Sequence, residues 1–207
     1  MGLQTIVKVN KVTNLADARY CAGMGVQMLG FCLDKYQSNF IEPKKAQEIA
    51  SWVVGVKVVG ELTNELEIDL NDYPLAMIEV NNPQLINNLA QSEQHRNAPL
   101  IYKIVIDNVE TLAHLNEVLN NYHAYVDYFL LESNLLSLSP QVTDLLKLLC
   151  ASFPILLGFG VNKNNVLAIL QDLKPTGFAF DASTTTSVGM LNSEELIEIL
   201  EILEVEE

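Results

Sequence analysis

The chain opens with a short apolar run, TIVKV at residues 5–9, followed by a helical pattern, LADARYCAGM at 15–24, and a second apolar run, VQMLGFC at 26–32. Short runs rich in branched residues predict strands, whereas apolar residues recurring every three or four positions predict an amphipathic helix. A strand, a helix and a second strand in this order predict a right-handed crossover between two parallel strands.

The same alternation continues to the end of the sequence. Further strands are predicted at 56–62, 75–80, 100–106, 126–131, 154–159 and 177–180. Helical patterns lie at 43–53, 83–95, 109–121, 140–151, 164–173 and 193–203, with a weaker one at 65–72. Eight strand–helix units in 207 residues predict a (β/α)8 TIM barrel of eight parallel strands, a single α/β domain over residues 1–207. A doubly wound open sheet is disfavoured, because no G-x-G-x-x-G follows the first strand.

Composition excludes several classes of function. Lys and Arg total 12 against 26 Asp and Glu, a net charge of −14, which would repel a phosphate backbone and argues against nucleic-acid binding. The sequence has no apolar run of about 18 residues that could span a membrane, and its first residues lack signal-peptide features, so we expect a cytoplasmic protein. Three cysteines without C-x-x-C spacing predict neither a disulfide framework nor a zinc site.

Several segments carry a likeness to a known family. Residues 8–18 read KVNKVTNLADA, 29–31 LGF, 37–46 QSNFIEPKKA, 56–64 VKVVGELTN, 130–132 LLE and 157–166 LGFGVNKNNV. In this order they resemble the strands and turns of the phosphoribosylanthranilate isomerases, enzymes of tryptophan biosynthesis. The resemblance covers nearly the whole chain without large gaps.

The resemblance implies a cofactor-independent Amadori rearrangement of a small phosphorylated ligand at the carboxyl end of the barrel. It places Asn10 where the family has a general-base Cys, Glu132 where it has a general-acid Asp, and Asn39 where an Arg helps to hold the substrate. It also assigns phosphate binding to the turns after strands seven and eight. The residues of this chain in those turns are Gly158, Gly160, Asp181, Ser183 and Thr184.

The family's reactive positions have changed chemically. An amide such as that of Asn10 has no useful basicity near neutral pH, and loss of a general base costs about 10²- to 10⁴-fold in rate. Glu132 keeps a carboxyl group one methylene further out, Asn39 removes a positive charge, and Asp181 would repel phosphate. Because these changes fall on one face of the barrel, we expect the fold to be preserved and the isomerase activity to be lost or changed.

Strand alternation gives an independent prediction of the site. Lys8 and Asn10 point to one side of the first strand, and Glu132 stands at the end of the sixth, which makes these three our candidate catalytic residues. Other charged residues are expected to converge on them: Lys57, Glu61, Glu79, Lys103 and Asp181. Such a cluster could bind a cationic or hydroxylated ligand or carry out acid–base chemistry, whereas structural ion pairs are the alternative, above all for Lys57 and Lys103.

Three functions stay open at this point. The chain could be a working isomerase in which Glu132 is the acid and another group, such as Cys32, replaces the missing base. It could be a barrel enzyme acting on another small substrate, phosphorylated or not. It could also be a pseudoenzyme that binds a metabolite or a protein partner. The sequence predicts no metal and leaves the oligomeric state open, a homodimer included.

Overall fold

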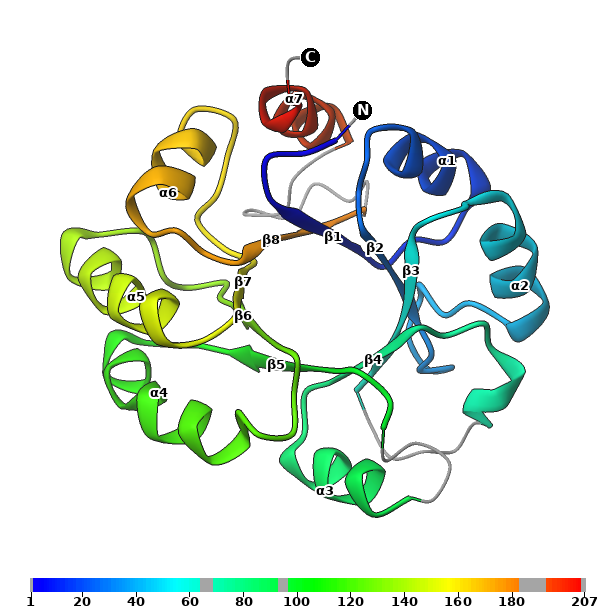
Figure 1. Cartoon of the computed structure of the whole chain (residues 1–207), viewed down its shortest axis with the longest axis horizontal. Helices are drawn as coiled ribbons and strands as arrows, with labels where there is room; N and C mark the ends of the chain where they lie inside the picture. The colour runs from blue at the N-terminus through cyan, green and yellow to red at the C-terminus, as the bar shows by residue number, and fades with distance from the viewer. Residues whose placement is uncertain (1, 64–68, 93–96, 183–192, 206–207) are drawn as a thin grey trace.

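Eight parallel strands pair in chain order and close into a barrel, with helices around the outside (Figure 1). The computed structural model describes residues 2–63, 69–92, 97–182 and 193–205. The strands are β1 (Ile6–Asn10), β2 (Met28–Cys32), β3 (Lys57–Leu62), β4 (Met77–Val80), β5 (Leu100–Val105), β6 (Tyr128–Glu132), β7 (Ile155–Leu157) and β8 (Gly177–Asp181). The predicted (β/α)8 barrel is therefore confirmed.

The helices follow the strands at the predicted places. They are α1 (Leu15–Gly23), α2 (Pro43–Trp52), α3 (Pro83–Gln91), α4 (Val109–Tyr122), α5 (Pro140–Ser152), α6 (Val166–Asp172) and α7 (Ser193–Leu203). Asn14 caps α1, since its side chain accepts a hydrogen bond from the backbone N–H of Asp17 at 2.9 Å. In the part of the chain that the structure describes, no helix is both long and apolar enough to cross a bilayer.

The connection between β3 and β4 differs from the prediction. A helix was expected over residues 65–72, but its described part forms a short 3₁₀ turn, η1 (Leu70–Asp72). Asp69 caps this turn by accepting a hydrogen bond from the backbone N–H of Asn71. Asp and Asn favour such local turns over continued helix, because their side chains bond to nearby backbone groups.

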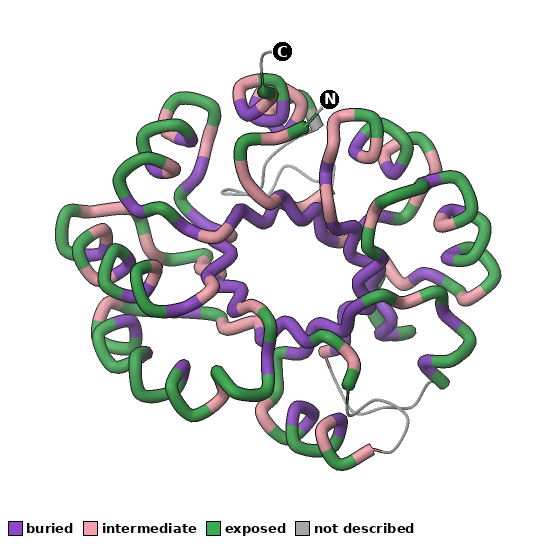
Figure 2. Tube along the Cα trace, viewed as in Figure 1, coloured by how far each residue is buried: buried purple, intermediate pink, exposed green. Residues whose placement is uncertain are grey.

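Side-chain alternation produces two apolar regions on the two sides of the sheet. The larger region lies between the strands and the helices, and Figure 2 shows it as buried positions on the inner sides of the helices and along the strands. The smaller region fills the inside of the barrel and contains Met28, Val59, Met77, Ile101, Leu130, Leu156 and Ala179. The interior is thus a packed core below the carboxyl ends of the strands.

The barrel closes where β8 pairs with β1. Five residue pairs form this seam, from Ile6 opposite Gly177 to Asn10 opposite Asp181. Close by, the backbone N–H of Gln4 donates to the carbonyl of Leu203 at 2.9 Å, so the two ends of the described chain lie together (Figure 1). A Cβ atom added at Gly177 would lie only 2.2 Å from the carbonyl oxygen of Ile6, which leaves no room for a side chain at the seam.

We therefore predict that Gly177→Ala destabilises the protein by about 1–3 kcal/mol or more, because the seam must open to admit a methyl group. Gly23→Ala is a matched control, since a Cβ at this last residue of α1 meets nothing within 4 Å. The control should be neutral or stabilising by up to about 1 kcal/mol. Urea unfolding followed by circular dichroism measures both, and equal stabilities of the two variants would contradict the close packing at the seam.

Candidate active site at the carboxyl end of the barrel

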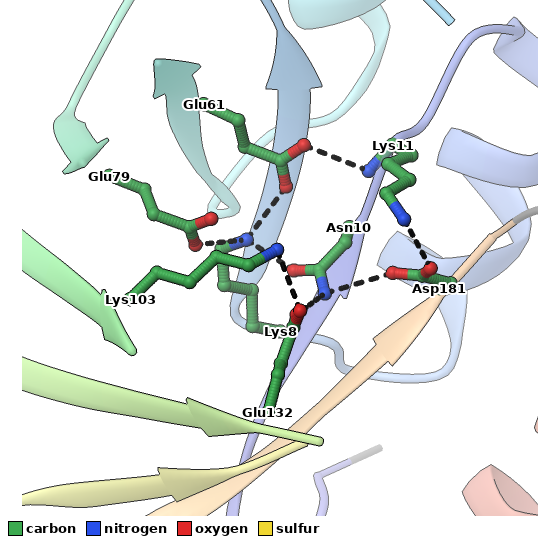
Figure 3. A network of polar contacts seen from close by, with 8 residues as sticks. All are labelled: Lys8, Asn10, Lys11, Glu61, Glu79, Lys103, Glu132 and Asp181. Carbon is green, nitrogen blue, oxygen red and sulfur yellow. Dashed lines mark hydrogen bonds and ion pairs between the residues drawn. The ribbon is translucent and has the colours of Figure 1, made fainter. Parts of the chain in front are cut away.

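A layer of polar side chains covers the apolar interior at the carboxyl ends of the strands. Inward-facing residues recur every second position along a strand, so the next inward position after the apolar layer lies one step nearer the barrel mouth. These positions hold Glu61 after Val59, Glu79 after Met77, Lys103 after Ile101, Glu132 after Leu130 and Asp181 after Ala179. The predicted convergence of charged side chains is confirmed for these five residues, and Figure 3 shows them facing one another.

Lys8 stands at the centre of this layer and is fully buried. Its Nζ atom donates hydrogen bonds to Asn10 Oδ1 and to Glu61 Oε1, the latter at 2.8 Å. The same Nζ also lies 2.8 Å from Glu79 Oε2, an ion pair whose geometry is not that of a hydrogen bond. Burial by itself would lower the pKa of Lys8, but the charges of Glu61 and Glu79 outweigh it and raise the pKa above 10.5. Lys8 is therefore a buried ammonium ion.

Glu61, one of the two carboxylate partners of Lys8, is itself buried. Burial raises the pKa of Glu61 above 4.5, and the charge of Lys8 offsets only part of this effect. Gly30 of β2 provides the space for the pair, because a Cβ there would lie 1.8 Å from Glu61 Oε1 and 2.9 Å from Lys8 Nζ. The sequence of β2 is thus matched to the ion pair beside it.

Asn10 connects the buried lysine to two carboxylates near the mouth. Its Oδ1 accepts from Lys8, and its Nδ2 donates to Glu132 Oε1 at 3.3 Å and to Asp181 Oδ1 at 3.1 Å. The pattern of neighbours assigns the amide orientation, since the oxygen faces a donor and the nitrogen faces two acceptors. Asn10 is 2% exposed, so it positions the two carboxylates from below.

Each of these carboxylates also has a lysine partner. Lys103 Nζ lies 2.7 Å from Glu132 Oε2, and Lys11 Nζ lies 2.6 Å from Asp181 Oδ2. Burial by itself would lower the pKa of Lys103, but Glu79 and Glu132 raise it. Burial by itself would raise the pKa of Asp181, but Lys11 and Asn10 together lower it below 3.8.

Lys11 is a site residue that the sequence analysis missed. It follows β1 in the left-handed backbone region, with φ of 57°, and its backbone N–H donates to Glu61 Oε2 at 3.3 Å. A non-glycine residue in this region is strained, and such strain is held in place by its surroundings. Strand alternation cannot place a residue beyond the strand end, so the only available signal was its position directly after Asn10.

A cavity of about 720 Å³ lies above one side of the polar layer, next to the ends of β1, β6, β7 and β8. Five predicted site residues line it: Asn10, Glu132, Gly158, Gly160 and Asp181. Lys8 lies beneath the cavity floor, and Asn39, in the turn after β2, is not among the described residues that line it. Ser183 and Thr184 lie outside the described residues.

Phe159 separates the two glycines of the turn after β7. A Cβ at Gly158 would lie 3.0 Å from Glu132 Cγ, while Gly160 has φ of 72° and a carbonyl that accepts from Asn165 Nδ2 at 2.8 Å. Phe159 is 5% exposed and packs in the outer core. The backbone of this turn, rather than the Phe159 side chain, therefore borders the cavity.

Two other predictions concern residues away from the cavity. Cys32 is buried, and its Sγ donates to the carbonyl of Asp34 at 3.9 Å. Burial raises the pKa of the Cys32 thiol, so Cys32 is poorly suited to act as a thiolate base in place of the residue at position 10. Lys57 is exposed at the start of β3, so the expectation of an internal ion pair is wrong for this residue, whereas it is confirmed for Lys103. Both lysines belong to inward-facing series, but Lys57 lies at the opposite end of the barrel.

The arrangement restricts the chemistry that the site could perform. Lys8 and Lys103 both have raised pKa values, so neither provides the neutral amine that a covalent lysine mechanism needs. Within the described ranges, no group of three or more His, Cys, Asp or Glu side chains could hold a metal ion. Glu132 and Asp181, which are partly exposed at the cavity, are the groups that could accept protons or bind hydroxyl groups.

A closed parallel barrel with a polar cavity at the carboxyl ends of its strands is the arrangement of the (β/α)8-barrel enzymes. Solved phosphoribosylanthranilate isomerases have the same fold. The enzyme from Thermotoga maritima superposes with a TM-score of 0.74 at 18% identity, covering 95% of this chain and 97% of that one. The enzyme from Thermococcus kodakaraensis gives 0.70 at 16% identity, covering 96% and 98%.

A third solved isomerase was captured in complex with reduced 1-(o-carboxyphenylamino)-1-deoxyribulose 5-phosphate. It gives a TM-score of 0.70 at 19% identity, covering 95% of this chain and 97% of that one. No protein-family model and no curated protein sequence matches this chain. The likeness to this family, predicted from short motifs, is thus confirmed at the level of the fold.

We predict that Lys8→Met destabilises the protein by about 3–5 kcal/mol at neutral pH, because it leaves Glu61 and Glu79 buried without their cation. Glu61 has a raised pKa in the folded state, so its ionisation opposes folding as pH rises above about 4.5. Part of the lost stability should therefore return as pH falls from about 7 to about 5.

The matched control is Lys57→Met, which makes the same change at an exposed position at the start of strand β3. It should change stability by less than about 0.5 kcal/mol, with little dependence on pH. Urea unfolding between pH 5 and pH 8 measures both variants. A Lys8→Met protein as stable as the control would contradict the central role of the buried ammonium.

Proposed function

We propose that this chain is a phosphoribosylanthranilate isomerase-like barrel that has lost the isomerase reaction and binds a different small ligand in its cavity. The observation that carries the proposal is the bonding of Asn10, at the position where the resemblance puts the general base. Its amide oxygen accepts from Lys8, and its amide nitrogen donates to Glu132 and Asp181.

The residue at the family's general-base position cannot act as a base here. Asn10 has no basicity to offer, and its three hydrogen bonds hold the amide in a positioning role. Cys32, the sequence alternative, has a raised pKa and is not among the described residues that line the cavity. A carboxyl group at Glu132 could still serve as an acid, but an acid alone supports only half of the rearrangement.

The residues at the expected phosphate-binding side of the cavity also argue for a change of ligand. One solved isomerase was captured with a 5-phosphate compound. In this chain the side of the cavity to which the resemblance assigns phosphate binding carries Asp181 at the end of β8, and Glu195 on α7 also lines the cavity; both are acidic. Like charges a few ångströms apart repel, so these residues disfavour a phosphate group there.

The alternative is a barrel enzyme that acts on another small substrate. It is favoured by the placement of Glu132 and Asp181, two partly exposed carboxylates that are held by the same amide at one cavity. Two carboxyl groups that share a cavity can divide acid and base roles between them. In either case the cavity, rather than the outer helices, is the functional site that we propose.

The first test is a fluorescence assay of phosphoribosylanthranilate consumption by the purified protein beside Glu132→Ala. We expect no turnover above the rate of this variant, because the general base is absent. Turnover by the unmodified protein that disappears in Glu132→Ala would overturn the proposal and establish an isomerase with a replacement base.

A further inference from the structure

We infer that the ligand of this cavity is an uncharged, polyhydroxylated molecule, a sugar or polyol without a phosphate group. The inference rests on the proposed function, since it concerns the same cavity, and it adds the chemical class of the ligand. Three properties of the lining carry it: its hydrogen-bonding groups, its charge balance and its apolar side chains.

The hydrogen-bonding groups suit hydroxyls, which both donate and accept. Amides and hydroxyls have the same dual capacity, whereas carboxylates only accept and ammonium groups only donate. The lining combines all of these types, in Lys11, Glu132, Ser133, Asn134, Ser137, Asn162, Asn165 and Asp181. A molecule with several hydroxyl groups can satisfy such a mixture, because each hydroxyl can turn its hydrogen toward whichever partner it meets.

The charge balance selects against charged ligands. Lys11 is the one cation among the described residues that line the cavity, and its Nζ is already 2.6 Å from Asp181 Oδ2. Glu132 is compensated in the same way by Lys103 at 2.7 Å. A phosphate would have to separate Lys11 from Asp181 and approach three carboxylates, because Glu195 also lines the cavity. A cationic ligand would find Glu132 and Asp181 already paired with lysines.

Apolar side chains also line the cavity. Leu136 and Leu138, in the loop after β6, are partly buried and stand among its polar residues. Sugars and polyols carry C–H groups beside their hydroxyls, and contact with apolar side chains removes these groups from water. A cavity of about 720 Å³ falls in the range of small-molecule sites and has room for a monosaccharide.

The test is isothermal titration calorimetry of the full-length protein with three probes, ribitol, D-ribose and ribose 5-phosphate. We expect saturable binding of ribitol and ribose, and binding of ribose 5-phosphate that is weaker than that of ribose by at least about tenfold, owing to charge repulsion. Asp181→Asn keeps the shape and releases Lys11 for a phosphate, so it should tighten ribose 5-phosphate binding by about tenfold or more.

The matched control is Asp172→Asn, which makes the same change in net charge on the exposed surface of α6. It should leave the binding of all three probes unchanged. Tighter binding of ribose 5-phosphate than of ribose by the unmodified protein would overturn this inference, and so would the absence of heat with all three probes. Neither result bears on the loss of isomerase activity, which the phosphoribosylanthranilate assay tests separately.

Discussion

The buried ammonium of Lys8 is the interaction on which the mouth of the barrel depends. A charge without water is tolerated only if it is paired and hydrogen-bonded, and Lys8 meets both conditions through Glu61, Glu79 and Asn10. Gly30 leaves the space for it. Since Asn10 is held by Lys8 from below, it can present its two N–H groups to Glu132 and Asp181, so the carboxylates at the cavity are oriented by a charge in the core.

Much of this arrangement could be predicted from the sequence, because alternation is a local property. The order of strands and helices and the convergence of Lys8, Glu132 and Asp181 follow from periodicity. Periodicity does not give the depth of a residue along the barrel axis. Lys57 was therefore expected inside the barrel, but it lies exposed at the amino end of β3. Lys11 was missed because its left-handed backbone turns its side chain in a direction that no strand pattern describes.

The apolar and polar layers of the barrel interior have different roles. Residues such as Val59, Ile101 and Leu130 fill the interior of the barrel, the fold that this chain shares with the isomerases. One step further along the same strands lie Glu61, Lys103 and Glu132, which form the ion pairs of the polar layer. A TM-score of 0.74 at 18% identity describes the shared fold, whereas the chemistry of the mouth depends on the residues of the polar layer.

The seam between β1 and β8 also has a consequence for how the chain folds. Thr5 Oγ1 donates to the carbonyl of Thr176 across a sequence separation of 171 residues, and Asn10 and Asp181 are equally far apart in the chain. Such contacts form only after most of the intervening chain has become ordered, because the entropy of closing a long loop is lost before the contact forms. Barrel closure and completion of the polar layer at β1 and β8 are thus expected to be one late, cooperative step.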